Sequence, residues 1–173
     1  KELIWFLEHK SVYTCGVNFN QKDILDKSVK IVKTNRGGKI TWHGPGQLIC
    51  YFVLDISKRK KDIRKFITVI ENSIIETLKD FKISSFSDRK NIGIWVLDKK
   101  EEKKIAAIGF RVKKWIAFHG FSLNLSNNLD NYKKIVPCGI SDKGISKIDN
   151  FKKVSKDKII NRLKINLIKN LKY

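Results

Sequence analysis

At 173 residues and 42% apolar content, the chain is long enough to bury a substantial core and too apolar to be intrinsically disordered. Its formal net charge of +20 would attract nucleic acid, anionic membranes or acidic proteins, but no apolar run approaches the roughly 18 residues of a membrane span. Lysine supplies most of this charge, and its abundance beside Ile and Asn indicates a coding bias that raises charge without any partner.

The N-terminal part of the chain predicts short strands. Residues 3–7 are apolar and predict a strand, and a second such segment follows at residues 12–13. Residues 21–30 are mostly polar and predict a loop or short helix, while residues 29–32 predict another strand. Because the chain contains no methionine, we expect further sequence to precede Lys1 in the natural protein.

A glycine-rich loop and the apolar run behind it are the stretch around which we expect the chain to be organised. Four of the ten glycines and one of the two prolines fall between Arg36 and Gly46, directly before the apolar residues 48–54. This pattern predicts a shaped loop that leads into a buried strand, since glycine lets a backbone approach a ligand closely. Arg36 offers a planar cation for a carboxylate or phosphate. The alternative is a tight connection with a solvated arginine, but the HGPGQ that follows favours a binding loop.

The remaining sequence predicts two helices and several strands. Apolar side chains recur every three or four positions across residues 61–81 and again across residues 155–171, with Ser155 as the expected N-cap. Strands are predicted at residues 83–86, 91–97, 104–112 and 115–125, the last interrupted at His119 and Gly120. A charged turn at residues 98–103 should join two of them in a hairpin. This content predicts a single α+β domain, a mixed β-sheet with flanking helices.

Cys138 lies between a proline and a glycine, a rigid and open setting that suits a nucleophile. A buried structural thiol is an equal alternative. A nucleophilic thiol needs a nearby cation or base, and the candidates are Lys104, His43 and His119. For either histidine, a core side chain bonded to backbone is the more common situation.

The small residues of the predicted strand 104–112 suggest where a ligand could lie. Ala106, Ala107 and Gly109 leave room in a buried strand for a ligand or another backbone.

The three cysteines of the chain also bear on metal binding and location. Cys15, Cys50 and Cys138 are far apart, without a C-x-x-C pair or a metal-ligand spacing to a histidine. We therefore expect no metal site and no disulfide framework. An odd number of unpaired cysteines indicates a reducing compartment, the cytoplasm.

Five blocks occur in order along the chain: LEHKSVYTCG, RGGKITWHGPGQL, KIAAIGFRV, HGFSLN and IVPCGI. Together they resemble the lipoyl(octanoyl) transferase family. The resemblance implies the catalytic-domain fold shared by biotin and lipoate protein ligases. It also implies transfer of an octanoyl or lipoyl group from octanoyl-acyl carrier protein to a lysine of a lipoyl domain, without ATP or another cofactor. The acceptors would be the lipoyl domains of 2-oxoacid dehydrogenase complexes and the glycine cleavage H protein.

The resemblance assigns roles to individual residues. It implies a thioester on Cys138, assisted by Lys104. The stretches matching the family's substrate-binding segments are Arg36, Gly37, Gly38, Lys39, Ile40, Thr41, Trp42 and His43; Ala107, Ile108 and Gly109; and Gly120, Phe121 and Ser122. The chemistry agrees, because a lysine can release and accept a proton, and burial beside an acyl chain would lower the Lys104 pKa. The chain departs from the family at Trp42, where tyrosine is usual, and at Ala107, where serine is common.

Two other functions remain open from the sequence. An ATP-dependent lipoate or biotin ligase of the same fold would use the glycine loop for an acyl-adenylate and would not need Cys138. A basic nucleic-acid-binding module would use the charge, although the chain shows no RNP-like motif, zinc finger or identifiable recognition helix.

Overall fold

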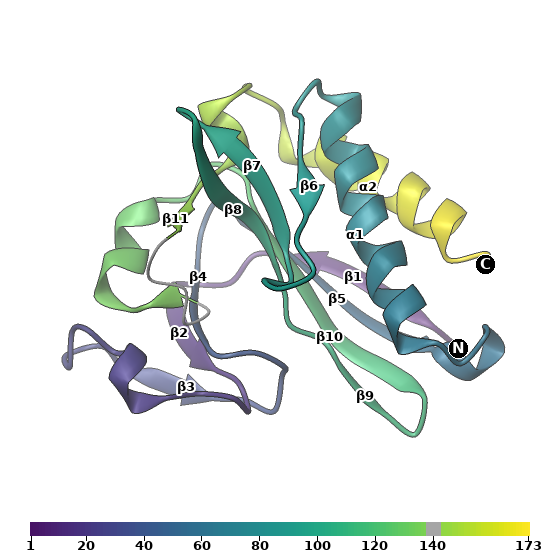
Figure 1. Cartoon of the computed structure of the whole chain (residues 1–173), viewed down its shortest axis with the longest axis horizontal. Coiled ribbons are helices and arrows are strands. Elements are labelled where there is room, and N and C mark those ends of the chain that lie inside the picture. Colours follow the sequence, from purple (N-terminus) through teal and green to yellow (C-terminus); the bar gives the residue numbers. More distant parts are fainter. Residues whose placement is uncertain (138–142) are drawn as a thin grey trace.

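The computed structural model describes residues 1–137 and 143–173, in which two β-sheets are combined with two long helices (Figure 1). The larger sheet contains, in spatial order, β1 (Leu3–Leu7), β5 (Gln47–Asp55), β10 (Ile116–Asn124), β8 (Glu101–Ile108), β7 (Ile94–Asp98) and β6 (Phe86–Ser87), with β9 (Arg111–Lys113) on β10 and β11 (Gly144–Ile145) on β8. The smaller sheet has the order β3 (Ile31–Lys33), β2 (Val12–Cys15) and β4 (Ile40–His43). Both sheets contain parallel and antiparallel pairs, so the predicted α+β class with a mixed sheet is confirmed.

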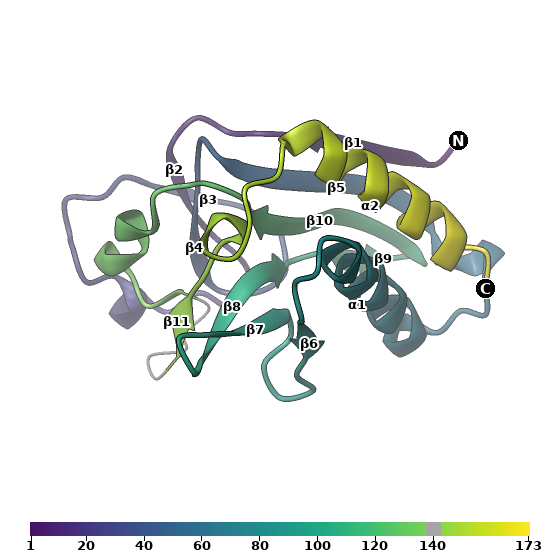
Figure 2. The ribbon, with the colours of Figure 1, turned by 90° about the horizontal axis from the view of Figure 1, so that it is seen from above.

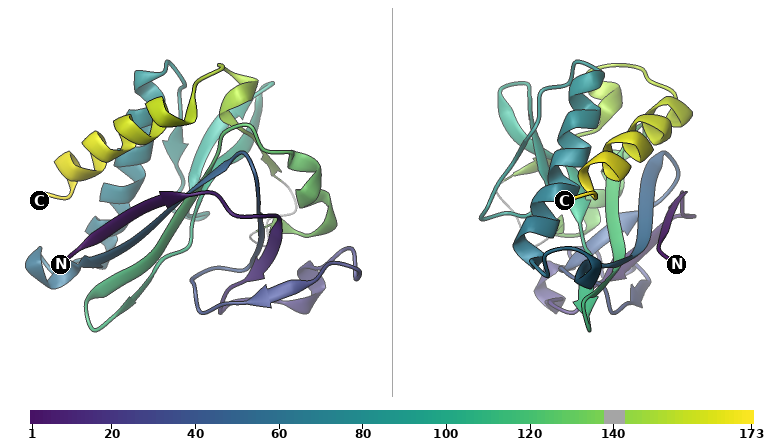
Figure 3. Two further views of the ribbon diagram at one scale, coloured as in Figure 1. Left: turned by 180° about the vertical axis from the view of Figure 1, so that it is seen from behind. Right: turned by 90° about the vertical axis from the view of Figure 1, so that its right-hand side faces the viewer.

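The helices α1 (Ile63–Asp80) and α2 (Lys156–Asn170) lie side by side against the larger sheet (Figures 2 and 3). Both follow the predicted apolar period. The side chains that α1 and α2 bury in the main core are Phe66, Val69, Ile70, Ile74, Leu78, Ile159, Leu163 and Leu167. Opposite them, β5 contributes its even-numbered side chains Leu48, Cys50, Phe52 and Leu54. Asp62 caps α1 by accepting a hydrogen bond from the backbone of Lys65, whereas Ser155 occupies the predicted N-cap of α2 without a side-chain bond.

The smaller sheet has a core of its own, formed by Tyr13, Ile40, Trp42, Tyr132 and Ile135. Tyr132 comes from the 3-10 helix Leu129–Lys134, which lies beside β4 at the left of Figure 1. Further 3-10 turns occur at Gln21–Asp23, Ile56–Lys58 and Ile148–Asn150. In the described parts of the chain, no helix is both long enough and apolar enough to cross a bilayer.

The predicted hairpin is confirmed, but two predicted strands are wrong in extent. The strands β7 and β8 pair antiparallel through a turn at Lys99 and Lys100, both of which have positive φ. The strand predicted at residues 83–86 is reduced to Phe86–Ser87, because the chain turns at Lys82 with φ 66°. The segment predicted as one strand at residues 104–112 is divided between β8 and β9.

A β-bulge in β8 sets the face on which its side chains lie. Ile94 pairs with Ala106 and Trp95 with Lys104, so Ile105 has no opposite partner. Ile105 and Ala106 are therefore both buried in the main core, while Lys104 and Ala107 both line a cavity. The prediction that Ala106 leaves room for a ligand is wrong for this reason, whereas Ala107 and Gly109 lie at the cavity.

Candidate active site

A cavity of about 850 Å³ lies where the glycine loop, β5, β8, β10 and the start of α1 meet. Cavities of roughly 300–1,000 Å³ are typical of small-molecule sites. The apolar side chains that line it are Ile49, Ile63, Ile67, Ile92, Ala107, Ile108, Phe110, Val112 and Phe121. The polar side chains that line it are Thr14, Asn18, Thr34, Arg36, Lys39, Thr41, His43, Tyr51, Lys90, Asn91, Lys104, His119 and Ser122. The cavity can therefore hold an alkyl chain beside a polar head.

The glycine loop is held by Arg36, whose guanidinium reaches back to β2. Its nitrogens donate to the Thr14 hydroxyl at 3.0 and 3.2 Å, to the Thr14 carbonyl at 2.8 Å and to the Gly37 carbonyl at 2.9 Å. Gly37 donates its N–H to the Gly109 carbonyl at 2.9 Å, and a Cβ there would lie 2.7 Å from the Phe110 carbonyl oxygen. The arginine thus positions the loop, and Gly37 is required by close backbone approach.

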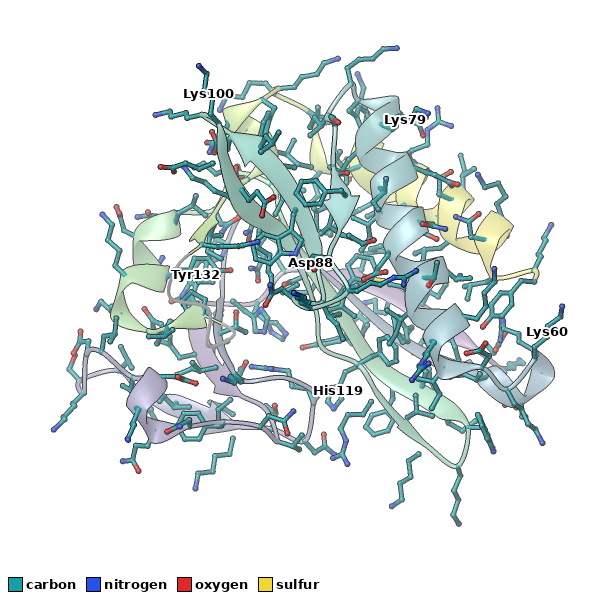
Figure 4. The ribbon with its side chains drawn as sticks, viewed as in Figure 1. Lys60, Lys79, Asp88, Lys100, His119 and Tyr132 are labelled. Carbon is teal, nitrogen blue, oxygen red and sulfur yellow. The ribbon has the colours of Figure 1, made fainter. Side chains whose placement is uncertain are left out.

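The loop is also bound from the side of β10. Asn35 accepts a hydrogen bond from Arg111 on its carbonyl at 3.1 Å, and its side-chain oxygen lies 2.7 Å from His119 Nε2. Because Ala117 and Phe121 face the main core, strand alternation would turn His119 toward the core as well. His119 instead lines the cavity, with a left-handed φ of 65° (Figure 4). The interruption predicted at this position is wrong as a strand break, since β10 continues through it.

Lys104 is buried, as expected, with only 4% of its surface exposed. Its Nζ donates to the Ile92 carbonyl at 3.1 Å and lies 4.8 Å from the centre of the Trp95 ring. The indole N–H of Trp95 in turn donates to the Asn91 carbonyl at 2.9 Å. A Cβ on Gly93 would lie 3.1 Å from Lys104 Cε, so the glycine leaves room for the lysine stem. A carbonyl and a ring face both attract a cation, and together they fix the amine at the cavity wall.

Among the described residues that line the cavity, Lys104 is the only titratable group that is more deeply buried than His43. Its Nδ1 lies 2.7 Å from Gln47 Oε1. Burial lowers the pKa of His43 to about 4, and the nearby Arg36 and His9 act in the same direction. The ring is therefore neutral at physiological pH. His9, whose pKa burial also lowers, bonds the Tyr51 hydroxyl at 2.7 Å.

The described cysteines are poorly suited to nucleophilic chemistry. Cys15 and Cys50 are both buried and free of disulfides. Burial raises the pKa of the Cys50 thiol far above its ordinary value, which suppresses the thiolate. Cys138 lies outside the described residues. Among the described residues, no cluster of His, Cys, Asp and Glu side chains could hold a metal ion.

The structure gathers most of the predicted site residues at one cavity. The predicted residues that line it are Arg36, Gly37, Gly38, Lys39, Thr41, His43, Lys104, Ala107, Ile108, Gly109, Gly120, Phe121 and Ser122. Ile40 and Trp42 do not reach it, because alternation along β4 turns them into the core of the smaller sheet. The sequence reasoning missed Thr14, Tyr51 and the α1 residues Ile63 and Ile67. Ile63 and Ile67 belong to the apolar face of the helix, and the sequence alone does not distinguish a core-facing side chain there from one that lines a cavity.

Comparison with solved structures shows the fold, and a family model defines the class of protein. Similar folds occur in lipoate-protein ligase A bound with ATP (TM-score 0.79, 16% identity, 99% of this chain and 73% of that chain) and in a bi-partite lipoate protein ligase from Thermoplasma acidophilum (0.76, 15%, 99% and 71%). Biotin protein ligase from Aquifex aeolicus is more distant (0.56, 13%, 96% and 70%). The family model of the lipoyl protein ligase A/B catalytic domain matches residues 1–168. The fold is that of this catalytic domain.

Curated relatives narrow the class. The octanoyltransferases of Wolbachia pipientis subsp. Culex pipiens and Ehrlichia chaffeensis are each 46% identical to this chain, over 149 and 150 residues. Each alignment covers 86% of this chain, and 73% and 70% of the relatives respectively. The chain belongs to the octanoyltransferase family, which confirms the predicted resemblance and makes the protein an acyltransferase of protein lipoylation.

Proposed function

We propose that the protein transfers an octanoyl or lipoyl group from acyl carrier protein to a lysine of a lipoyl domain, through a thioester on Cys138. The observation that carries the proposal is Lys104, a buried amine fixed at the wall of a cavity that is lined by both apolar and polar side chains. Such an amine can move protons beside an acyl chain without exposing the reaction to water. Octanoyltransfer is the activity of the family, and the covalent route and the carrier donor are our proposal.

The proposed reaction has two steps. In the first, Lys104 takes the proton of the Cys138 thiol, and the thiolate attacks the carbonyl carbon of the carrier thioester. The new carbon–sulfur bond replaces the carrier's bond, and the departing carrier thiolate receives the proton from Lys104. In the second, the neutral amine of the acceptor lysine attacks the acyl-enzyme. The amide bond replaces the enzyme thioester, and Lys104 carries the proton from the amine to the Cys138 sulfur.

The described flanks of Cys138 support this assignment. On the N-terminal side, the backbone of Val136 donates to the Asp23 carbonyl at 2.7 Å. On the C-terminal side, β11 pairs with β8, Gly144 opposite Lys103 and Ile145 opposite Lys104. The Nζ of Lys143 lies 4.8 Å from the same Trp95 ring as Lys104. The burial of Cys15 and Cys50 leaves Cys138 as the cysteine best suited to carry the acyl group.

Intact mass after incubation with octanoyl-acyl carrier protein tests the covalent step. We expect an octanoyl adduct on the wild-type protein, none on Cys138→Ala, and a normal adduct on Cys15→Ala. Hydroxylamine should remove the adduct, because it cleaves thioesters. Octanoyl transfer by Cys138→Ala to a lipoyl domain would overturn the covalent mechanism.

Two further experiments distinguish the proposed acyltransferase from the alternative functions. An ATP-dependent ligase would catalyse exchange of pyrophosphate into ATP in the presence of octanoate or lipoate, and we expect no such exchange. A nucleic-acid-binding module would bind DNA or RNA with a steep salt dependence. For the acyltransferase we expect acidic protein partners instead, namely acyl carrier protein and the lipoyl domains of 2-oxoacid dehydrogenase complexes or the glycine cleavage H protein, in the cytoplasm.

A further inference from the structure

The buried polar side chains behind His43 form a chain of hydrogen bonds that fixes where the imidazole carries its proton. We propose that Gln47 and Asn124 hold His43 with its proton on Nδ1, so that Nε2 presents a bare lone pair to the cavity and accepts a hydrogen bond from an N–H group of the substrate. The identity of that substrate rests on the proposed function, whereas the position of the proton does not.

The chain starts at the backbone carbonyl of Ser146, which can only accept. The side-chain atom of Asn124 that lies 3.0 Å from it must therefore be the amide nitrogen, which leaves the Asn124 oxygen facing Gln47. The Gln47 atom 2.9 Å from that oxygen is then the nitrogen, so the Gln47 oxygen faces His43 Nδ1 at 2.7 Å. An oxygen there requires a proton on Nδ1. The tautomer thus follows, by inference, from one backbone carbonyl.

Neighbouring groups support the same orientation. The Asn124 oxygen also receives the side-chain N–H of Asn127 at 3.2 Å and lies 3.3 Å from the Tyr132 hydroxyl, as expected of an oxygen among donors. Gln47 Nε2 lies 2.7 Å from the same hydroxyl. Gln47 is fully buried, and Asn124 nearly so. Turning either amide over would place like atoms against each other where water cannot compensate, at a cost of roughly 1–3 kcal/mol per unsatisfied group.

The other ring nitrogen is directed to the ligand side. His43 is 9% exposed and lines the cavity, and no described residue forms a hydrogen bond with its Nε2. The charged and titratable groups around it are Arg36 and His9, together with Lys39, Tyr51, Lys90, Lys104 and His119 on the cavity wall. A neutral ring of this tautomer can only accept at Nε2. His43 is thus a binding site for an N–H donor.

Two sources of such a donor exist in the proposed reaction. One is an amide N–H of the pantetheine arm that carries the acyl thioester. The other is the neutral amine of the acceptor lysine. A hydrogen bond from either donor would shift the Nε2 signal in the same way. The experiment therefore distinguishes the two donors by adding ligands that contain only one of them.

The position of the proton can be measured without any activity. The chain has three histidines, so His9→Gln and His119→Gln assign the remaining ¹⁵N imidazole signals to His43. From about pH 5.5 to about pH 8 we expect one neutral form of His43 with the proton on Nδ1. A proton on Nε2 would overturn the proposal while leaving the proposed acyl transfer untouched.

The role of Gln47 is tested by a pair of variants. Gln47→Met has a similar length but cannot accept from Nδ1, so the His43 signals should show a mixture of tautomers. Single-turnover transfer should fall at least about tenfold. Tyr132→Phe is the matched control, because it removes the Gln47 bond to the Tyr132 hydroxyl but leaves the Gln47 bonds to His43 and Asn124 in place; its tautomer should be that of the wild type. Retention of the wild-type tautomer in Gln47→Met would contradict the role of Gln47.

The ligand is identified with Cys138→Ala protein, which should bind without turnover. S-octanoyl-pantetheine contains amide N–H groups, while the octanoyl thioester of ethanethiol contains none. A shift of the Nε2 signal with the first probe alone assigns the bond to the donor arm. A shift only on adding an unmodified lipoyl domain assigns it to the acceptor amine. If no probe moves the Nε2 signal, His43 is not a substrate ligand and the proposal fails.

Discussion

The two faces of β5 carry different kinds of side chains. Its even-numbered residues, such as Leu48 and Phe52, are apolar and pack beneath the helices. On the opposite face, Ile49 and Tyr51 line the cavity, and two side chains have specific partners: Gln47 bonds His43 and Asn124, and Tyr51 bonds His9. On the first face, packing depends on the volumes of the side chains. On the second face, the arrangement of the side chains depends on which atom donates each hydrogen bond and which accepts it. Substitutions on the helix side should therefore change stability, and those on the cavity side should change chemistry.

Lys104→Met gives the largest expected effect and tests the cavity side. Removing the amine while keeping the apolar stem should lower the rate of acyl transfer by about 10²–10⁴-fold, the range typical of proton-transfer groups. Lys104→Arg should be nearly as slow, since arginine retains the cation but does not release its proton. The control is Lys103→Met, whose lysine pairs with Glu101 and does not line the cavity. Wild-type turnover by Lys104→Arg would make Lys104 an electrostatic partner only.

Ile74→Ala tests the helix side. Ile74 is fully buried in the main core, and its truncation should lower the free energy of unfolding by about 2–5 kcal/mol. Activity per folded molecule should remain close to that of the wild type. Urea unfolding combined with transfer assays below the transition measures both quantities. Ile168→Ala, at an exposed position of α2, should have little effect on either. A specific loss of kcat in folded Ile74→Ala would show that the two sides are coupled.

Acidification should destabilise the protein through His43. The His43 pKa is lowered from 6.5 to about 4 in the folded state, so the unfolded chain binds more protons between these pH values. Its contribution to stability is present above about pH 6.5 and is lost as the pH falls toward about 4, by up to about 3 kcal/mol. Urea unfolding of wild type and His43→Gln at several pH values isolates the contribution of His43 to the free energy of unfolding, because the other titrating groups are the same in both proteins. Equal pH slopes would mean that His43 is not neutral in the folded protein.

The smallest effect concerns the lysines outside the cavity. Lys60, Lys79 and Lys100 lie at separate outer edges of the molecule, away from His119 (Figure 4). Such charges should speed the encounter with acidic carrier proteins more than they set the chemical step. Raising the salt from about 50 to about 500 mM should raise KM for the carrier severalfold and leave kcat nearly constant. A KM that does not respond to salt would mean that the net charge reflects coding bias and has no role in the encounter with the carrier.

Periodicity predicted the elements on which packing depends. The helix α1, the strand β5 and the β7–β8 hairpin were found because their apolar patterns follow the helix and strand periods. The bulge at Ile105 could not be predicted, since a single extra residue leaves no compositional signal. The sequence therefore identified Lys104 through its motif but not the geometry that places it beside Ala107.

The polar partners of the site were harder to predict than its motif residues. Gln47 and Asn124 lie 77 positions apart, and only the pairing of β5 with β10 brings them opposite each other. The sequence pattern indicates an irregularity at His119 and Gly120, but it does not reveal the left-handed backbone at His119, because even histidine, which adopts that conformation more often than most residues, does so in a minority of cases. Motif reasoning found many of the residues that line the cavity, and the tertiary fold supplied the remaining ones and the groups that orient them.

The backbone of the glycine loop is tied to two neighbouring segments. Val17 and Asn18 donate their N–H groups to the Arg36 and Gly38 carbonyls, each at 3.1 Å, while Gly37 donates to Gly109. A loop held in this way is already in one conformation before a ligand arrives, so little ordering entropy is lost on binding. The amide protons of Gly37, Val17 and Asn18, which form these bonds, should exchange with solvent as slowly as those of a strand. The association rate of an acyl donor should accordingly be limited by encounter rather than by closure of a lid.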